Sequence, residues 1–588
     1  MPILCSLLLG ALPVAPAEDK ELFTLYIADA ETFFAHEKDA GLLNALQMIN
    51  ARLAELPGEI PGGMPVPPEM ISLATGLLTG EKSLRIGTTD DPNMPFPIYG
   101  QLDVMEGDEA AAQHLAMTLM QLGQMAGVPF GDAGEDGLSR LNAPVPVEVV
   151  FGAKGSSVVL SAGKTIDHGV DLSASGLPEG VDPSFLMMLD LGGFMGVAEK
   201  WLTAMGQADQ FENPLAQIGM GNLMVRVASG CDSERSYTIS RMRGHSKWAS
   251  GAGLSPRRNL TASDIDLIPQ SATFAAVSSI NFGGTLDFIL NMVEPQLAQQ
   301  GMDDPVGMLA AMTGFNVKTD LFDNLGDTVG FYTSDATGGG GLLSLVGFVE
   351  LSNPEGMLSL IERLEDIING MGASAAQGYV RTRTWEHRGN EYISLAFPGL
   401  PVPAEPTLSI SGNHLFFGMT PGATVGAVES AQREGGLSDN ARFQENLPRA
   451  ITACESISFA DSPRLLRHGY GLTSLICSGL VNGTRSRFNP DRDAGMIMPT
   501  YPELARGAKA SVWATYVDGD DYVSEQRADS SVLVNLTSTV GLVSSSPLML
   551  LIPAALVGTA TSREMSAGAY VPMPVIDTAD APTSAAIR

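Results

Sequence analysis

The sequence predicts an α+β protein with two homologous domains, each a mainly antiparallel sheet with helices packed on one face. Strand-like segments recur in the same order roughly 250 residues further along the chain, which is typical of an internal duplication. The strands come as hairpins around Gly-containing turns, with helical segments between them, and this pattern favours antiparallel pairing. No GxGxxG motif follows the first strand, which argues against a dinucleotide-binding α/β fold.

Five pairs of elements carry the repeat: an opening strand, a strand before an acidic turn, the helix after that turn, a hairpin and a closing hairpin. In this order, the pairs are 23–28 with 272–277, 99–104 with 346–351, 108–125 with 353–368, 147–161 with 408–419, and 223–242 with 511–527. An additional hairpin, 379–396, is expected in the second unit only. If a function is localised, we expect it in this second, diverged copy.

The helices are predicted from apolar spacing and from the residues at their ends. In the first unit, Leu42, Leu46 and Ile49 follow helical spacing before the Pro- and Gly-rich loop 57–68 breaks the pattern. In the second unit, Asn353 is a suitable N-cap and Pro354 suits the first helical position.

The unit boundaries follow from changes in composition. An apolar run that ends at the A-x-A motif Ala15-Pro16-Ala17 predicts a signal peptide, with a buried first strand as the alternative. A Gly-, Ser- and Pro-rich stretch predicts a linker, in which Arg257 and Arg258 are expected to be solvated. The predicted segments are a signal peptide (1–17), a first domain (18–247), a linker (248–264), a second domain (265–530), an apolar segment (531–562) and a disordered tail (563–588).

The charge balance narrows the partners and the compartment. The chain has 588 residues, with 66 acidic against 34 basic residues and a net charge of −32. Such a field repels phosphate groups, which argues against a nucleic-acid partner. With the signal peptide, the sequence predicts an extracytoplasmic protein of the periplasm or cell envelope, whose partner is an envelope protein or an apolar ligand.

One stretch resembles a known group of proteins. Residues 408–419 form a strand pair around Gly412-Asn413, a helix follows to Gln432, and Leu437-Ser438-Asp439-Asn440-Ala441-Arg442-Phe443 comes next. This succession resembles a bacterial extracytoplasmic family of unknown function, whose members are secreted or membrane-tethered. The resemblance implies a location and a fold with duplicated α+β domains, and it brings no catalytic motif.

Few residues form a pattern that carries chemistry. None of the seven histidines lies at metal-ligand spacing, and no GxSxG motif occurs. The alternating oxygen ligands Asn489, Asp491 and Asp493 suggest a calcium loop, with an Asx-type turn as the alternative. No other cofactor is expected.

Three cysteines remain after the predicted signal peptide. Cys454 and Cys477 both lie in the second unit, where they could form a disulfide in an oxidising compartment. The alternative is that all three, with Cys231, are small core residues.

The stretch 530–562 contains no charged residue and has its most apolar part at 548–557. Such a run is long enough to span a bilayer, so a membrane anchor is one interpretation. A buried helix that closes the second domain is the other.

These observations favour a non-enzymatic envelope-associated protein with a structural or binding role. One alternative is a carrier that holds a lipid or another apolar ligand in a cavity between sheet and helices. The other is a hydrolase whose catalytic residues are dispersed along the sequence.

Overall fold

The computed structural model describes residues 20–545 except for 60–75, 77–78, 90–97, 106–107, 126, 135–136, 143–146, 167, 205–213, 218, 300–306, 308–309, 311–313, 340, 375 and 400–403. The predicted signal peptide, the predicted tail and the most apolar part of the 531–562 segment therefore lie outside the described residues.

The described strands alternate buried and less buried positions, as expected for strands with two different environments. The first half contains β1 (Lys20–Ile27), β2 (Lys82–Thr88), β3 (Ile98–Met105), β4 (Phe130–Ala133), β5 (Leu138–Leu141), β6 (Val149–Lys154), β7 (Ser157–Ala162), β8 (Asp182–Asp190), β9 (Met224–Cys231) and β10 (Arg235–Arg243). The second half contains β11 (Ala272–Ser279), β12 (Leu325–Ser334), β13 (Val346–Leu351), β14 (Arg381–His387), β15 (Asn390–Ala396), β16 (Thr407–Ser411), β17 (His414–Gly418), β18 (Ser456–Ala460), β19 (Ser511–Asp518) and β20 (Asp521–Asp529).

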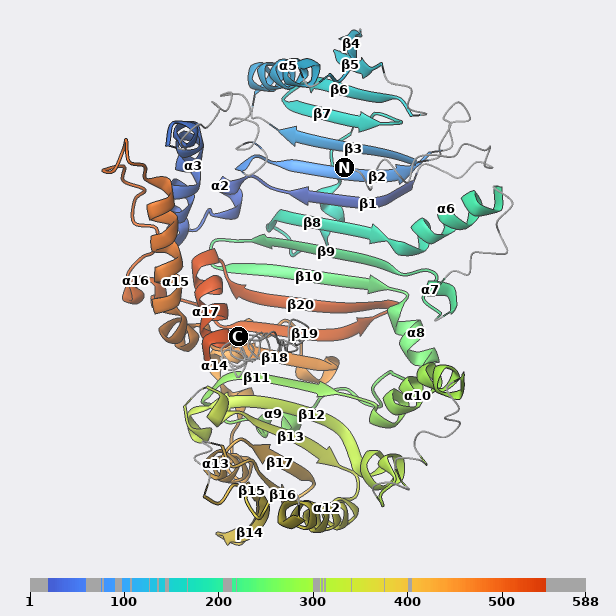
Figure 1. Cartoon of the computed structure of the whole chain (residues 1–588), viewed down its shortest axis with the longest axis vertical. Helices are drawn as coiled ribbons and strands as arrows, with labels where there is room; N and C mark the ends of the chain where they lie inside the picture. Colours follow the sequence, from blue (N-terminus) through green and yellow to red (C-terminus); the bar gives the residue numbers. More distant parts are fainter. Residues whose placement is uncertain are drawn as a thin grey trace, which may run out of the picture.

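These strands join into one antiparallel sheet that runs through the whole described chain (Figure 1). The first half contributes the order β4-β5-β6-β7-β3-β2-β1-β8-β9-β10. The second half continues it as β20-β19-β18-β11-β12-β13-β17-β16-β15-β14. The predicted antiparallel α+β class is confirmed, and the sheet passes from one half to the other without a break.

Outward from the centre of the sheet, the two halves repeat the same strand order. β10 pairs with β20 along its whole length, and Ile239 lies opposite Glu525 at the middle of the pair. A register shift also occurs at the same place in both halves, after Glu21 in β1 and after Ala272 in β11. The matched strands, helices and hairpins of the sequence occupy equivalent places in this order. A common ancestry of the halves remains a proposal.

The hairpin predicted for the second unit alone has a counterpart in the first. β14 and β15 form the outer hairpin of the second half, and β4 and β5 form it at the opposite edge of the sheet. The prediction was therefore wrong. The first-half strands are shorter, at four residues each, and sequence alternation is too brief to detect over that length.

Capping side chains and proline mark the starts of helices, as α12 shows. Asn353 accepts a hydrogen bond from the Gly356 N–H, and Pro354 is the first residue of α12, as predicted. The longer helices are α3 (Ala40–Glu59), α5 (Glu109–Met125), α6 (Leu191–Ala204), α10 (Phe282–Gln299), α12 (Pro354–Ser374), α13 (Pro421–Ala431), α15 (Ser462–Thr484) and α17 (Val532–Ser545). The shorter helices are α2 (Ala30–Phe33), α7 (Pro214–Gln217), α8 (His245–Gly251), α9 (Ala262–Asp266), α14 (Ala441–Asn446) and α16 (Tyr501–Ala505).

In the second half the helices cover both faces of the sheet, so the expectation of a single covered face was wrong. Successive residues of a strand point to opposite faces. In β13, Phe348 packs into the cluster that includes Ala423 and Ala427 of α13. Its neighbour Val349 packs against Met357 and other residues of α12.

Helices also gather beside both sets of strand ends. Figure 1 shows α3, α15, α16 and α17 together on one side, and α6, α7, α8 and α10 together on the other. Each group combines helices from both halves of the chain. On the first side, Ala45 of α3 shares a hydrophobic cluster with Leu466 of α15 and Leu533 of α17. The predicted domains 18–247 and 265–530 therefore share their sheet and part of their core.

Asp39 strengthens this connection between the halves. Its buried carboxylate accepts hydrogen bonds from the Ser531 hydroxyl at 2.9 Å and from the backbone N–H groups of Val532 and Leu533 at 2.8 and 2.9 Å. It thereby caps the N-terminus of α17, where free N–H groups attract a negative charge. The start of the predicted 531–562 segment is thus a packed helix. In the part of the chain that the structure describes, no helix is both long and apolar enough to cross a bilayer.

Candidate functional site

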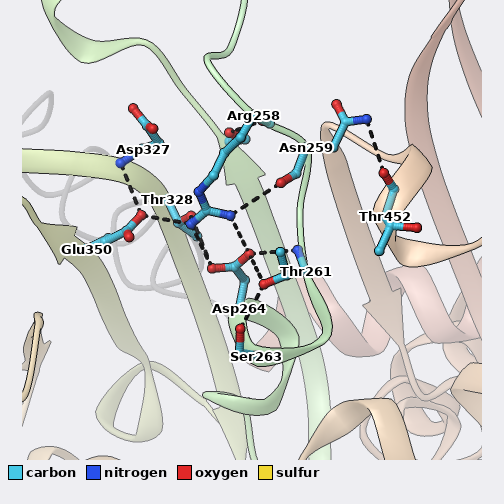
Figure 2. Close-up of polar contacts among 10 residues, drawn as sticks. Arg258, Asn259, Thr261, Ser263, Asp264, Asp327, Thr328, Glu350 and Thr452 are labelled. Carbon is cyan, nitrogen blue, oxygen red and sulfur yellow. Dashed lines mark hydrogen bonds and ion pairs between the residues drawn. The ribbon is translucent and has the colours of Figure 1, made fainter.

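The densest polar cluster of the described chain surrounds Arg258 (Figure 2). Its guanidinium donates two hydrogen bonds to the Asp264 carboxylate, at 2.7 and 3.0 Å. It also donates to the Thr328 hydroxyl at 2.7 Å and to Glu350 Oε2 at 2.9 Å. Thr261 adds two bonds to Asp264, from its backbone N–H and its hydroxyl, each 2.7 Å long. The cluster thus joins α9 to strands β12 and β13.

The electrostatics of this cluster hold it in one protonation state. Burial opposes ionisation of Asp264, but the hydrogen bonds from Arg258 and Thr261 outweigh it and lower the pKa of this carboxyl. The hydrogen bond to Asp264 in turn raises the pKa of Arg258. Groups that are fully paired and permanently charged do not exchange protons near neutral pH, so the cluster is suited to a structural role.

This arrangement corrects one expectation for the 248–264 segment, the solvation of Arg258. Arg258 was expected to be solvated with Arg257, yet it is the centre of an ion cluster. Arg257 does stay exposed and lies 3.8 Å from Asp327. The partners of Arg258 are up to 92 residues away in sequence, so the local composition could not reveal them.

The described histidines form no catalytic pair. His168 lies 3.9 Å from Glu21, and His387 lies 3.8 Å from Glu429, and both histidine side chains are exposed to solvent. His414 is close to the Arg258 cluster, where burial lowers its pKa although Glu350 opposes the change. Within the described residues, no hydrogen bond joins a histidine side chain to a serine or cysteine side chain.

The predicted calcium ligands lie at an exposed loop. The Asn489 amide donates to the Glu55 carboxylate, which also pairs with Arg492 between the two aspartates. Asp493 accepts a bond from the Gly495 N–H at 2.8 Å, which is the Asx-type turn considered as the alternative. Among the described residues, no group of three His, Cys, Asp or Glu side chains is placed to hold a metal ion.

The predicted disulfide is not formed. Cys231, Cys454 and Cys477 are all free thiols. Cys454 belongs to the large hydrophobic cluster that includes residues of α13. Cys477, which is part of α15, belongs to the cluster that α15 shares with α3. Since the two side chains lie in different cores, the alternative of small core residues describes them.

Two surface hollows of the described chain are large enough to compare with the cavity of an apolar-ligand carrier. One of about 240 Å³ lies along α12, between Leu360, Leu364 and Phe315, with Arg363 and Asp366 at its rim. The other, of about 490 Å³, lies over 488–492 and includes the predicted calcium ligands Asn489 and Asp491. Both are open to solvent, whereas a carrier of apolar molecules needs an enclosed apolar cavity.

A different feature crosses much of the sheet: two neighbouring rows of side chains on one face contain no charged residue, the first from β17 to β9 and the second from β7 to β12. We call them the first and the second uncharged row. Residues in each row lie directly opposite one another on successive strands. The first row is Phe417, Gly347, Phe331, Ala276, Ser458, Trp513, Gln526, Thr238 and Ser229. Beyond β9, the first row continues through Phe185 and Ile27 to the charged Lys82. The second row is Leu160, Leu102, Leu84, Leu25, Met187, Val227, Ser240, Ser524, Thr515, Ser456, Ser278 and Val329.

The two rows differ in kind between the halves. In the first half, the second row begins with four leucines on β7, β3, β2 and β1. The equivalent strands of the second half contribute two aromatic side chains to the first row, Phe417 on β17 and Phe331 on β12. Phe417 and Phe331 are 53% and 47% exposed. A Cβ atom on Gly347 would lie 2.1 to 2.7 Å from three atoms of the Phe417 ring. The ring therefore lies flat over the glycine, with its other side toward solvent.

Comparisons with protein-family models, with curated proteins and with solved structures find no match. The uncharged rows are therefore the main guide to function.

These rows were not predicted from the separate strands, although the sequence contains a signal for them. Alternate positions of β10, β19 and β20 lack charge in a chain with 66 acidic residues. That these positions share one face depends on strand register, which only the folded sheet determines.

Proposed function

We propose that this chain is a non-enzymatic extracytoplasmic protein that binds a neutral polysaccharide across the two uncharged rows. The observation that carries the proposal is the absence of charge from both rows in a chain with a net charge of −32. The opposite face of the same central strands carries Arg226, Arg241 and Glu525. A surface kept free of charge suits an uncharged partner, because a charged one would lose its hydration there without gaining an ion pair.

The side chains of the first row favour a carbohydrate over a purely apolar partner. Phe417 and Phe331 are two strands apart, which places their Cα atoms about 10 Å from each other, with the Phe417 ring over the intervening Gly347. The C–H groups of a sugar ring can pack on the exposed aromatic face, since that face is the negative side of the ring quadrupole. Between and beyond the aromatic rings, Ser458, Gln526 and Thr238 offer hydroxyl and amide groups that can donate and accept hydrogen bonds.

The shape of the surface fits an extended polymer better than a small molecule. The first row crosses nine strands, a distance of roughly 40 Å at ordinary strand spacing. The two ends of the second row, Leu160 and Val329, pack into the clusters of α5 and α12, so its open part lies between these helices. The extracytoplasmic location rests on the predicted signal peptide and is part of the proposal.

The test is affinity electrophoresis in gels that contain dextran, amylose or hydroxyethyl cellulose. We expect retardation by at least one neutral polymer, and we expect Phe331→Ala/Phe417→Ala to weaken it. Each lost aromatic contact contributes about 0.5 to 1.5 kcal/mol, so the double variant should bind roughly 5- to 150-fold more weakly.

Tyr379→Ala is the matched control, because Tyr379 is also 47% exposed but lies outside the rows. It should leave retardation unchanged. Absence of retardation in every neutral polymer, or equal retardation of the double variant and the parent protein, would contradict the proposal. Retention of a protein or an acyl-chain probe in place of a polysaccharide would also contradict it.

A further inference from the structure

Two stretches without acidic residues meet in the fold. Residues 462–490, which include all of α15, contain no Asp or Glu, and residues 530–562, which include α17, contain no charge. In a chain with 66 acidic residues, the structure packs these two helices against each other. Gly469 allows the close approach, since a Cβ atom there would lie 1.9 Å from the Thr537 carbonyl oxygen.

Both helices expose apolar side chains. On α15, Leu472, Leu475 and Ile476 form a stripe at helical spacing, and Leu475 and Ile476 are 69% and 55% exposed. On α17, Leu536 and Val543 are exposed as well. We call these five residues the α15–α17 surface. In Figure 1, α15 lies on the outer side of the helices beside the strand ends, away from the sheet.

Basic residues stand at both ends of α15. Arg467 is exposed in its second turn, and Arg485 is exposed directly after its last residue. The apolar stripe lies between them. A helix that lies in the plane of a bilayer has this pattern, because apolar side chains enter the acyl region while long basic side chains reach back to the phosphate groups.

We propose that the α15–α17 surface lies on a phospholipid bilayer, with α15 parallel to the membrane plane. The proposal concerns peripheral insertion of a few side chains and needs no spanning helix. It goes beyond the binding of a polysaccharide, because the uncharged rows are on the sheet whereas this surface is beside the strand ends. The missing acidic residues are the decisive feature: the high negative charge of the rest of the chain would repel lipid phosphates, whereas the two helices that carry this surface contain no acidic residue and α15 contains arginines.

The test is flotation of the full chain with phosphatidylcholine vesicles, whose phosphate groups the arginines can contact. Leu475→Glu/Ile476→Glu replaces the two most exposed side chains of the stripe, and it should not disturb the core because both point to solvent. Loss of two inserted aliphatic side chains should lower the partition coefficient about 100-fold.

Ile289→Glu/Met292→Glu on α10 is the matched control. These side chains are 50% and 54% exposed but lie on the opposite group of helices. The control should float like the parent chain, and circular dichroism should show that both variants are folded. Equal flotation of the parent and the Leu475→Glu/Ile476→Glu variant would overturn the proposal, and so would equal losses in the α15 and α10 variants.

Two further measurements distinguish insertion of this surface from membrane binding by residues 546–588 and from a protein contact. A chain that ends at Ser545 should still float, and should still lose flotation through Leu475→Glu/Ile476→Glu; loss of all flotation on truncation would overturn the proposal. A change of molecular mass by the same substitution without vesicles would identify a protein contact instead. Retardation by polysaccharide should be unaffected, so failure here and failure of the proposed function are distinguishable.

Discussion

Replacing Arg258 by methionine removes the centre of the ion cluster while it keeps most of the side-chain volume. The variant loses both hydrogen bonds to Asp264 and those to Thr328 and Glu350. Asp264, whose side chain is 7% exposed, keeps the two bonds from Thr261 and a longer one of 3.3 Å from the Thr328 hydroxyl, but it loses its cation. The substitution therefore leaves a buried carboxylate without its cation, and this unpaired charge destabilises the folded state.

The size of the expected destabilisation depends on how exposed the ion-pair partners are. Breaking one side of a buried ion pair costs about 3–5 kcal/mol, but partial exposure of the arginine screens the interaction. We therefore expect a local destabilisation of about 2–3 kcal/mol. Arg257→Met is the control, since its neighbouring, exposed side chain makes only a 3.8 Å contact and should change stability by less than about 0.5 kcal/mol.

Hydrogen exchange is the appropriate assay, because a chain of this size is not expected to unfold in one step. Amides of β12 and β13 should exchange roughly 30- to 150-fold faster in the Arg258→Met variant. If these amides exchange at the parental rate, or if Arg257→Met has the same effect, the assigned role of the cluster is refuted.

The pH dependence gives a second check with a defined sign. The pKa of Asp264 is lowered in the fold, so its ionised form contributes stability above the unfolded value of about 3.9 and loses it as the pH falls through the lower folded value. The stability difference between the parent chain and Arg258→Met should be largest near neutral pH and narrow as the pH falls, because burial without the arginine raises the pKa of Asp264 in the variant and its protonation removes the unpaired charge. A difference that widens in acid would contradict the assignment.

Two further predictions concern the contact between the halves and the cysteines. Asp39→Ala should destabilise α17 by about 2 kcal/mol and speed its proteolysis, because three donors lose their acceptor; Asp29→Ala, which caps only the short α2, should leave α17 intact. Burial raises the pKa of the Cys454 thiol to about 11, so this thiol should resist a thiol reagent at about pH 8 until urea unfolds the chain. Rapid labelling of the folded protein, or a Cys454–Cys477 disulfide in a non-reducing peptide map, would contradict this placement.

Much of the local structure could be predicted from short-range patterns. Phe23-Thr24-Leu25-Tyr26-Ile27 alternates as β1 does, and Asn353-Pro354 marks the start of α12 because capping and the fixed φ of proline act within a few residues. The metal site and the disulfide could be predicted less well from the sequence, since ligand geometry and thiol distance depend on contacts between distant segments. Asn489 contacts Glu55 across 434 residues, which no local spacing could indicate.

The sequence by itself determined the alternation of the strands, the order of the repeated elements and the stretches that lack charge. These properties depend on neighbouring residues and on the two-residue period of a strand. Only the tertiary structure decided that β10 pairs with β20, that α3 packs on the helices of the other half, and that the uncharged positions align into rows. The physical reason is register: a shift by one residue would turn each strand over, and the pairing that prevents it joins residues hundreds of positions apart.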